Sequence, residues 1–378
     1  MTRQGVSPTR RALRKLARQR AAMISLVVLV LLYLGAIFAP FLAPYYYDNV
    51  LRAHSYAPPN LHFFDEHGRF HLRPFVYAMS YEWDASYQRR YVEDRSRRYP
   101  VRFFYRSDDR QNAYNFLFLF PTNRHLVGVD PPARVYLMGA DEQGRDLWSR
   151  ILFGSRISLS VGFVGAGISF VLGMLIGGAS GYAGGKTDNL IMRLCEMVML
   201  APAFYLMLAL RAALPAKIPS WQVYLLIVAI LSFIGWAGLA RVIRGMVLSL
   251  SRQEYVLAAR AVGAGHATII LRHILPNTLS YAIIAVTVSI PGYILGETGL
   301  SLIGLGIQEP YASWGNLLSA AMSIPEMQFH PWILVTGLFI LVAVMCFNFL
   351  GDGLRDAFDP RSLAQPGAGD EEDAHAAP

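Results

Sequence analysis

Residues 21–44 read AAMISLVVLVLLYLGAIFAPFLAP and contain no charged side chain. The hydrocarbon core of a bilayer is about 30 Å thick and takes about 20 apolar residues of α-helix, so this stretch predicts a first membrane-spanning helix. The preceding residues 1–20 carry seven lysines and arginines and no acid. Because cationic flanks stay in the cytoplasm, we expect the N-terminus on that side. A cleaved signal peptide is less favoured, since the run is long and Pro40 and Pro44 occupy the candidate cleavage region.

The remainder of the chain is also apolar, with 54% hydrophobic and 16% charged residues among 378. These proportions are too apolar for an ordinary soluble domain. Four charged residues lie near the ends of predicted spans, where they can snorkel or face protein: Arg193, Glu196, Arg211 and Glu297. The sequence predicts an all-α integral membrane protein with both termini in the cytoplasm and six transmembrane helices, at about 21–44, 157–181, 189–213, 222–243, 278–303 and 331–351.

The distribution of charge agrees with this topology. Much of the net charge of +8 comes from residues 1–20 and from the segment Arg241–Arg272, which the topology places in the cytoplasm. Lys217 is the lone base in the two short outer loops, 214–221 and 304–330. Basic cytoplasmic flanks therefore explain the charge more simply than nucleic-acid binding does. The two cysteines lie inside apolar spans and indicate neither a disulfide framework nor a metal site.

The outer loop, residues 45–140, is long enough to fold by itself and is rich in tyrosine, phenylalanine and arginine. Residues 62–78, HFFDEHGRFHLRPFVYA, alternate on either side of Glu66, His67 and Gly68 in the manner of a β-hairpin. We therefore predict a partly β extracytoplasmic subdomain. It either packs on the helices as a cap, which is slightly favoured, or contacts a delivered substrate or its carrier.

The predicted organisation has five parts. The acidic, small-residue tail is expected to be disordered because it cannot bury enough apolar surface. The residues DEQGRDLW, 141–148, look like an interfacial turn before the second span. In order, the parts are a basic cytoplasmic tail (1–20), a first span (21–44), an outer-loop subdomain (45–140), a five-helix permease core (141–361) and a disordered tail (362–378).

Motifs for catalysis or nucleotide binding are missing from the sequence. Residues 181–187, GYAGGKT, end like a phosphate-binding loop, but the required earlier glycine is replaced by Ser180 and the stretch follows a predicted span. A tight turn with Lys186 as a cytoplasmic anchor explains it better. HExxH, GxSxG and CxxC patterns are absent from the sequence, as is a chain of intramembrane acids for a proton path.

A polar, basic segment lies between the fourth and fifth spans, where residues 255–277 read YVLAARAVGAGHATIILRHILPN. An apolar stripe at helical spacing comprises Tyr255, Ala258, Ala259 and Val262. Gly263 and Gly265 permit a turn, and a second short helix at about 266–275 is expected to end at Pro276, with Asn277 and Thr278 capping the next span. The residues alone are equally consistent with a helix in a groove of another protein and with a connector on the lipid surface.

The segment resembles the cytoplasmic signature of the permease subunits of binding-protein-dependent ABC importers, in the dipeptide and oligopeptide branch. That signature is Glu-Ala-Ala, three residues, Gly, nine residues and a short stretch ending in Leu-Pro. Here Ala258, Ala259, Gly263 and His273–Pro276 match its spacing, and Leu257 stands at the Glu position. Residues 139–159, 181–193, 299–318 and 351–361 also look like this branch, whereas most of the outer loop does not.

The resemblance implies a type I ABC importer permease fold and a mechanism. Segment 254–276 would be a coupling helix seated in a groove of a separate ATPase subunit, so that ATP-driven closure switches the helices between inward-open and outward-open states. The residues implied in docking are Glu254, Tyr255, Leu257, Ala258, Ala259, Arg260, Val262, Gly263 and Pro276, with Arg252 as a further candidate to pair with acids of the ATPase. Gly304, Gly306 and Trp314 would shape an outer gate, contact the binding protein, or only pack closely.

The same resemblance implies the partners and the location. This chain would perform no bond chemistry and hold no cofactor or metal, with ATP and Mg²⁺ bound by the partner ATPase subunits. A homologous second permease and an extracytoplasmic substrate-binding protein would complete the importer in a bacterial or archaeal cytoplasmic membrane. The cargo would be peptides or a related small solute.

Two other classes of protein remain as alternatives. An ion-gradient-driven secondary transporter would need ion sites at mid-membrane and usually an internal repeat, and the sequence has no convincing repeat. An intramembrane enzyme would need a nucleophile, metal ligands or a carboxylate pair at membrane depth, and the spans offer none at suitable spacing. The importer subunit is the favoured hypothesis.

Overall fold

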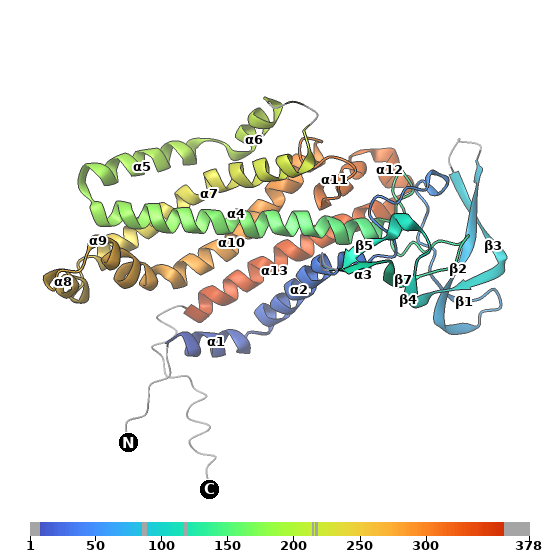
Figure 1. Cartoon of the computed structure of the whole chain (residues 1–378), viewed down its shortest axis with the longest axis horizontal. Coiled ribbons are helices and arrows are strands. Elements are labelled where there is room, and N and C mark those ends of the chain that lie inside the picture. The colour runs from blue at the N-terminus through green and yellow to red at the C-terminus, as the bar shows by residue number, and fades with distance from the viewer. Residues whose placement is uncertain (1–7, 85–88, 117–119, 214, 216–217, 359–378) are drawn as a thin grey trace, which may run out of the picture.

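The computed structural model describes residues 8–84, 89–116, 120–213, 215 and 218–358. Long helices lie side by side along the molecule, and the β-strands gather at one end of them (Figure 1). The predicted disordered tail, 362–378, lies outside the described residues.

Five helices within the described ranges are long and apolar enough to cross a bilayer, which confirms an all-α multi-pass membrane protein. Two of them are extended by a short helical lead-in, which begins at His266 for the fourth and at Pro331 for the fifth. The five are α2 (Arg20–Ile37), α4 (Leu147–Ala183), α7 (Ser220–Leu250), α10 (Leu279–Leu302) and α13 (Val335–Phe358).

The third predicted span, 189–213, differs from the prediction of one continuous helix. It consists of α5 (Gly185–Leu200) and α6 (Ala203–Ala212), which are separated at Ala201 and Pro202. Proline lacks an N–H donor, and its ring pushes the preceding residue out of the helical region. Ala201 accordingly has an extended backbone, with φ −68° and ψ 120°. The third predicted span is therefore a pair of helices with a break between them and not a single long helix.

Helices α4 and α7 pack unusually closely along the centre of the bundle. Gly173, Gly177 and Gly181 recur every four residues on the face of α4 that meets α7. A Cβ atom on Gly181 would lie 2.6 Å from the carbonyl oxygen of Arg244, and one on Gly177 would collide with the backbone of Ala240. Small residues at this spacing let two backbones approach, which is how helices associate in a membrane without a hydrophobic driving force.

The basic N-terminal tail contains a helix, α1 (Pro8–Arg18), which packs on the far end of α13. Ala12 and Leu16 are buried there with Ala357. The Lys15 ammonium donates a hydrogen bond to the carbonyl oxygen of Asp356 over 2.7 Å. The described parts nearest the two termini thus lie together, at the end of the bundle remote from the strands (Figure 1).

The outer region contains the β-structure that the sequence predicts. Strands β1, β2 and β3 form an antiparallel sheet in that order, and β4 pairs with β7 and β5 with β6. Val76, Val101 and Val135 are buried in its core. The strands are β1 (His62–Phe64), β2 (Phe70–Trp83), β3 (Arg89–Pro100), β4 (Arg102–Arg106), β5 (Tyr114–Phe116), β6 (Phe120–Thr122) and β7 (Arg124–Gly128).

The predicted hairpin is the turn between β1 and β2. The Asp65 carboxylate accepts hydrogen bonds from the backbone N–H groups of His67 (3.0 Å) and Arg69 (2.9 Å). Gly68 has φ +72°, which glycine adopts without steric cost. The pKa of Asp65 lies below its ordinary value. A hydrogen bond with His71 is the largest cause, and the two backbone hydrogen bonds add to it.

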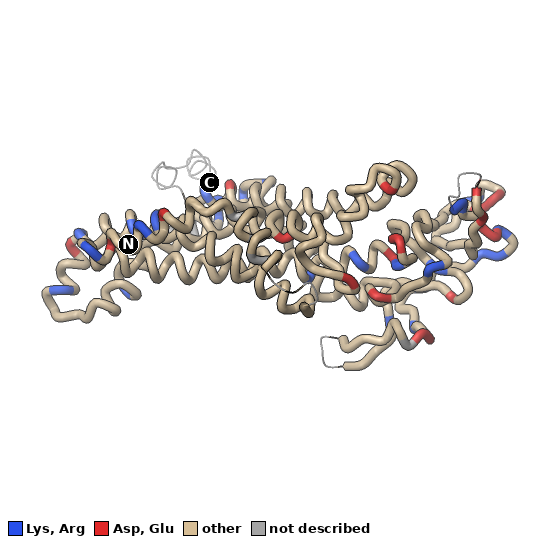
Figure 2. The backbone as a smooth tube through the Cα atoms, turned by 90° about the horizontal axis from the view of Figure 1, so that it is seen from above, with Lys and Arg blue, Asp and Glu red and all other residues tan. Residues whose placement is uncertain are grey.

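Charged side chains are distributed unevenly along the molecule, and short helices complete its connections. Figure 2 shows Lys, Arg, Asp and Glu concentrated toward its two ends, with few between them, as expected for a protein whose middle lies in hydrocarbon. The short helices outside residues 254–278 are α3 (Ala39–Leu42), α11 (Trp314–Leu318) and α12 (Ile324–Phe329), with 3₁₀ turns at Arg52–His54, Arg110–Asn112, Ser319–Met322 and Pro331–Leu334.

Helix α4 begins at a buried acidic cap. The Asp146 carboxylate accepts a hydrogen bond from the backbone N–H of Ser149 (2.8 Å), while its Oδ1 atom is buried without a hydrogen-bond partner. Burial penalises the charged form and raises the pKa of Asp146 to about 6. The residue lies eleven positions before the predicted membrane segment 157–181, so its environment is the packed region next to the strands.

We expect Asp146→Asn to stabilise the protein relative to wild type as the pH rises from about 4 to 6. Because the pKa of Asp146 is higher in the folded protein than in the unfolded chain, Asp146 ionises at a lower pH in the unfolded chain. Ionisation therefore destabilises the folded protein, by up to about 3 kcal/mol above pH 6. Asparagine is neutral and still caps the helix. Melting temperatures of the two proteins should coincide near pH 4 and diverge above it. A constant difference across this range would contradict the assignment.

Candidate functional site

The segment predicted to contact a partner lies at the end of the bundle opposite the strands. It contains α8 (Glu254–Ala261), a glycine turn, α9 (His266–Thr268), a π-helical turn (Ile269–Ile274) and a 3₁₀ turn (Leu275–Thr278) that leads into α10. In Figure 1, α8 projects beyond the ends of α4 and α7. It is therefore accessible in this chain.

Helix α8 is held by one apolar face and exposes another. Val256 and Ala259 are buried in a cluster with Ile243 and Val247 of α7. On the other side, the exposed fractions are 43% for Tyr255, 49% for Leu257 and 84% for Val262, and Ala258 is exposed as well. The predicted stripe is thus divided, because Ala259 faces the protein's own helices while Tyr255, Ala258 and Val262 face outward.

The turn after α8 has the hydrogen-bond pattern of a Schellman motif. The Gly263 N–H donates to the Arg260 carbonyl and the Ala264 N–H to the Ala259 carbonyl, both over 3.0 Å. Gly263 has φ +80°, in the left-handed region that glycine adopts most easily. The local sequence therefore ends α8 at Val262 and turns the chain back toward the bundle.

The returning segment does not end at Pro276, contrary to the prediction. The chain stays helical from His266 to Leu302, through the π turn and the 3₁₀ turn. Since proline cannot donate to a carbonyl four residues earlier, the change of helical pitch accommodates it without a break. The Asn277 amide donates to the His273 carbonyl (2.7 Å), and Thr278 makes no cap to α10 through its side chain. The segment after α8 and α10 therefore form one continuous helical stretch.

Polar contacts fix the segment to neighbouring helices. The Arg260 guanidinium lies 4.9 Å from the ring centroid of Tyr182, and the Tyr182 hydroxyl is hydrogen-bonded to His266 Nδ1 (2.9 Å). The Asn277 amide reaches the Tyr255 hydroxyl over 3.3 Å. Arg260 thus has a partner within this chain, in addition to any that it finds on another protein.

An ion pair ties α5 to α7 beside this segment. Arg244 Nε donates to Asp188 Oδ1 over 2.9 Å, and Ser180 donates to the same oxygen over 2.6 Å. Between them, Gly184 and Gly185 have φ values of +63° and +58°. The stretch 181–187 is therefore the tight turn between α4 and α5 that the sequence indicates.

The predicted outer residues occupy different environments. Trp314 is fully buried, and its indole N–H donates to the Ile151 carbonyl over 3.2 Å. Gly306 is also buried, and a Cβ atom there would lie 2.6 Å from Ser301 Cα. Gly304 is exposed at φ +75°. Of the three, Gly304 alone is placed where another protein could reach it without rearrangement.

Glu297 organises the outer end of α10. Its carboxylate accepts hydrogen bonds from Ser158 (2.9 Å) and Ser301 (2.7 Å). Ser158 in turn accepts from the Trp314 N–H, and Ser301 from the Ile307 N–H. A buried carboxylate without an ion pair among the described residues needs such donors. In the sequence, the signal for this site was an acid near the end of an otherwise apolar span. The sequence did not reveal the partners of this acid.

A second outer cluster joins the start of α4 to the loop before α11. Arg145 Nε donates to Asp141 (2.8 Å) and Arg150 Nη2 to Glu309 (2.8 Å), and each arginine also contacts the other acid. Burial lowers the pKa of Arg145, but hydrogen bonds and charges of Glu309 and Asp141 outweigh it and raise that pKa. The stretch 141–148 is a turn, as predicted, yet it is also part of this four-charge network, which sequence analysis missed.

A cavity of about 310 Å³ opens between α4, α7 and α10. Its wall contains a small cluster of polar residues. The Ser169 hydroxyl donates to the Ser232 carbonyl (3.0 Å) and is hydrogen-bonded to the Tyr293 hydroxyl. The lining is otherwise small or apolar and includes Gly235, Gly238, Ser289 and Gly292. Hydroxyls and glycines at membrane depth can line a path for a polar solute.

We expect Arg150→Met to lower the free energy of unfolding by about 1–3 kcal/mol, because Arg145 then remains as the single described cation paired with both Asp141 and Glu309. Arg102→Met is the matched control, since Arg102 forms an exposed pair with Asp130 (2.6 Å) and should lose at most about 1 kcal/mol. Thermal unfolding in detergent compares the two. Equal losses would show that the buried network is not a special constraint.

We expect Gly263→Ser to destabilise the turn after α8 by about 1–2 kcal/mol, because serine is strained at φ +80°. Gly265→Ser receives the same side chain at φ −66°, where it is compatible and can cap α9, so it should be neutral. Neither site has an atom within 4 Å of the added Cβ. Hydrogen exchange of residues 254–266 measures the local effect, and equal exchange in both variants would contradict it.

Two family models match the chain. Residues 169–363 match the binding-protein-dependent transport system inner membrane component, which covers about half of the chain. Residues 7–59 match the N-terminal TM domain of oligopeptide transport permease C. The matches include α1, α2 and the whole of segment 254–278, and they leave the β-rich region between them.

Curated relatives match over most of their own length. The oligopeptide transport system permease protein OppC of Haemophilus influenzae is 42% identical over 242 residues, which are 64% of this chain and 75% of that protein. OppC of Bacillus subtilis is 35% identical, covering 64% and 77%, and the dipeptide permease DppC of the same organism is 38% identical, covering 61% and 70%. The chain belongs to the family of binding-protein-dependent transport system inner membrane components.

Proposed function

We propose that this chain is the membrane-spanning permease subunit of an ATP-driven importer of peptides, and that it couples to a separate ATPase through α8. Membership of the family supports the importer class, and the names of its oligopeptide and dipeptide relatives support the cargo. In this proposal the chain forms part of the solute path and performs no bond chemistry.

The exposed apolar face of α8 is the observation that carries the proposal. Tyr255, Leu257 and Val262 expose large apolar surface on a helix that projects beyond the bundle, beside the exposed Ala258. Exposed apolar patches of this kind mark contact surfaces for other proteins. The small side chain of Ala258 would let the helix approach a groove closely, while Val256 and Ala259 keep it attached to its own subunit.

The connection from α8 to α10 suggests how force would pass. A displacement of α8 would move the turn at Gly263 and the helical segment that runs from His266 into α10. Because this segment stays helical to Leu302, motion at the cytoplasmic end would reach Glu297 and the outer residues that it holds. The ATPase, with its ATP and Mg²⁺, would bias two states of this unit.

The proposed topology places α8 and both termini in the cytoplasm. Helix α1 and α8 lie toward one end of the bundle and the β-rich region lies at the other (Figure 1). The seven basic residues of the N-terminal tail favour the cytoplasm for the first end. The β-rich region would then face outward, where an extracytoplasmic binding protein delivers cargo, and Gly304 would be accessible to it.

A second permease completes the proposed path. Many apolar side chains of α2 and α13 are exposed on the surface of this chain, including Ile24, Leu31, Leu338 and Leu341. Lipid or a homologous subunit would cover them. The cavity between α4, α7 and α10 is open on one side, and a second subunit would close it into a passage.

We expect Ala258→Glu to abolish co-purification of an ATPase subunit with the tagged permease from its native membranes, because a buried carboxylate would enter the docking groove. Ala17→Glu is the matched control. It makes the same change at an exposed position of α1, on the same side of the membrane and away from α8. The control should retain the ATPase at the wild-type level.

Three outcomes separate the possibilities. Loss in Ala258→Glu alone, with normal membrane insertion, supports the coupling role. Equal retention in both variants contradicts docking through this face. Absence of any ATPase from wild type, under conditions that preserve known importer complexes, would favour an ion-gradient-driven transporter, which uptake across a proton or sodium gradient would then test.

A further inference from the structure

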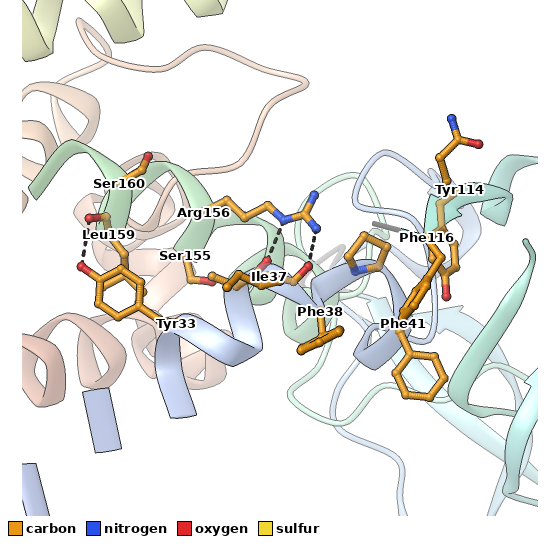
Figure 3. Close-up of a pocket in the computed structure, with 13 residues that line it drawn as sticks. Tyr33, Ile37, Phe38, Phe41, Tyr114, Phe116, Ser155, Arg156, Leu159 and Ser160 are labelled. Carbon is orange, nitrogen blue, oxygen red and sulfur yellow. Dashed lines mark hydrogen bonds between the residues drawn. The ribbon is translucent and has the colours of Figure 1, made fainter. Parts of the chain in front are cut away.

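A cavity of about 270 Å³ lies where the C-terminal end of α2 meets α3, α4 and β5. Figure 3 shows Arg156 of α4 reaching across to the end of α2, with aromatic side chains of α3 and β5 beyond it. The aromatic residues of the wall are Tyr33, Phe38, Phe41, Tyr114 and Phe116. The site therefore combines one charged group with a mostly apolar wall.

Arg156 uses only part of its hydrogen-bonding capacity within the chain. Its Nε atom donates to the Ala36 carbonyl (2.6 Å) and its Nη2 atom to the Ile37 carbonyl (2.8 Å). These are carbonyls of the last turn of α2, which lack partners inside that helix. Arg156 forms no ion pair with any described carboxylate, and its Nη1 atom has no hydrogen bond in the described part of the chain. A full positive charge and free donors thus remain.

The position of Arg156 along the membrane normal follows from the length of α2. This helix has 18 residues, or about 27 Å, which is close to the thickness of the hydrocarbon core. The last carbonyls of α2 therefore lie at one boundary of the hydrocarbon, and Arg156 lies there with them. Lipid phosphates lie beside this level, where Trp and Tyr are enriched in membrane proteins, and Tyr114 lines the cavity there.

An apolar groove continues from the cavity along the outside of α2. It has a volume of about 470 Å³ and shares Phe38, Phe41 and Phe116 with the cavity. Its other walls are Leu31, Leu34 and Gly35 of α2. Leu31 and Leu34 are 61% and 42% exposed, so the groove opens to the surroundings of the helix. Its shape suits a hydrocarbon chain that runs from the boundary toward the centre of the bilayer.

We propose that this site binds one anionic phospholipid, with its phosphate at Arg156 and one acyl chain in the groove along α2. The planar guanidinium matches phosphate geometry, and the missing carboxylate partner leaves its charge available. The bound lipid would join α2, α3 and α4 at the base of the β-rich region. This role is additional to transport and does not depend on the coupling through α8.

The test measures which lipids stay with the protein. The full-length permease, with any subunits that co-purify, is reconstituted in an equal mixture of phosphatidylglycerol and phosphatidylcholine with identical acyl chains. After mild extraction, native mass spectrometry counts the lipids retained. Both lipids offer a phosphate acceptor, but the choline ammonium cancels the net charge of phosphatidylcholine. Wild type should therefore retain about tenfold more phosphatidylglycerol than phosphatidylcholine at one site.

Two variants remove the two halves of the site separately. Arg156→Gln keeps a donor for the α2 carbonyls but removes the charge, so the tenfold preference should fall to about equal retention. Gly35→Leu fills the groove without touching Arg156 and should remove retention of both lipids. Gly167→Leu is its control, because Gly167 of α4 is half-buried like Gly35 and lies outside the groove. An added Cβ meets nothing within 4 Å at Gly167 and only the Leu152 side chain, at 3.7 Å, at Gly35.

The proposal fails if wild type shows no preference or if Arg156→Gln keeps it. It also fails if Gly35→Leu and Gly167→Leu retain the same number of lipids. A crosslink from Leu34→Cys to a second permease subunit, in place of protection by lipid, would overturn it by making the groove a subunit interface. Melting temperatures within a few degrees of wild type show that the variants are folded.

Discussion

The close contact between α4 and α7 is the constraint on which the arrangement of this protein depends. In a bilayer, helices gain nothing from burying apolar side chains against one another, because lipid is equally apolar. Close van der Waals contact must replace that driving force. Gly173, Gly177 and Gly181 bring the backbone of α4 against that of α7, and side chains at these positions would collide with α7. The contact extends to the ends of both helices that are remote from the strands, where α7 passes into the segment that carries α8.

This contact explains how a short exposed helix can be held firmly. Helix α8 has only eight residues, too few to be stable alone in water. Val256 and Ala259 enter a cluster built by α4, α7 and the start of α10, and the turn at Gly263 returns the chain to that cluster. The outward side of α8 is thereby free to present Tyr255, Leu257 and Val262. A rigid base and an apolar outer face are what transmission of force to another subunit requires.

Charged side chains buried within the bundle are paired with hydrogen-bond donors or with opposite charges. Glu297 is surrounded by serine hydroxyls, and Arg150 lies between two acids. Glu297 links α10 to α4, and Arg150 links α4 to the loop that follows α10. At the opposite end of the bundle, the ion pair of Asp188 with Arg244 adds to the apolar packing. Arg156 differs, because it contacts two backbone carbonyls and the Phe153 ring, and no described carboxylate balances its charge. That imbalance is the reason to look for a ligand there.

Local chemistry determined much of what the sequence revealed. The apolar runs, the β-hairpin around Gly68, the turns at Gly184 and Gly263 and the signature between Ala258 and Pro276 could all be recognised, because hydropathy, backbone conformation and motif spacing are properties of neighbouring residues. The break at Pro202 was also visible in principle, but a long apolar run outweighed it. Tertiary structure alone decided that Ala259 faces inward while Ala258 faces outward, that Arg150 meets Glu309, and that Glu297 meets Ser158. These outcomes depend on distances between residues far apart in the chain, and only the packing of whole helices sets such distances.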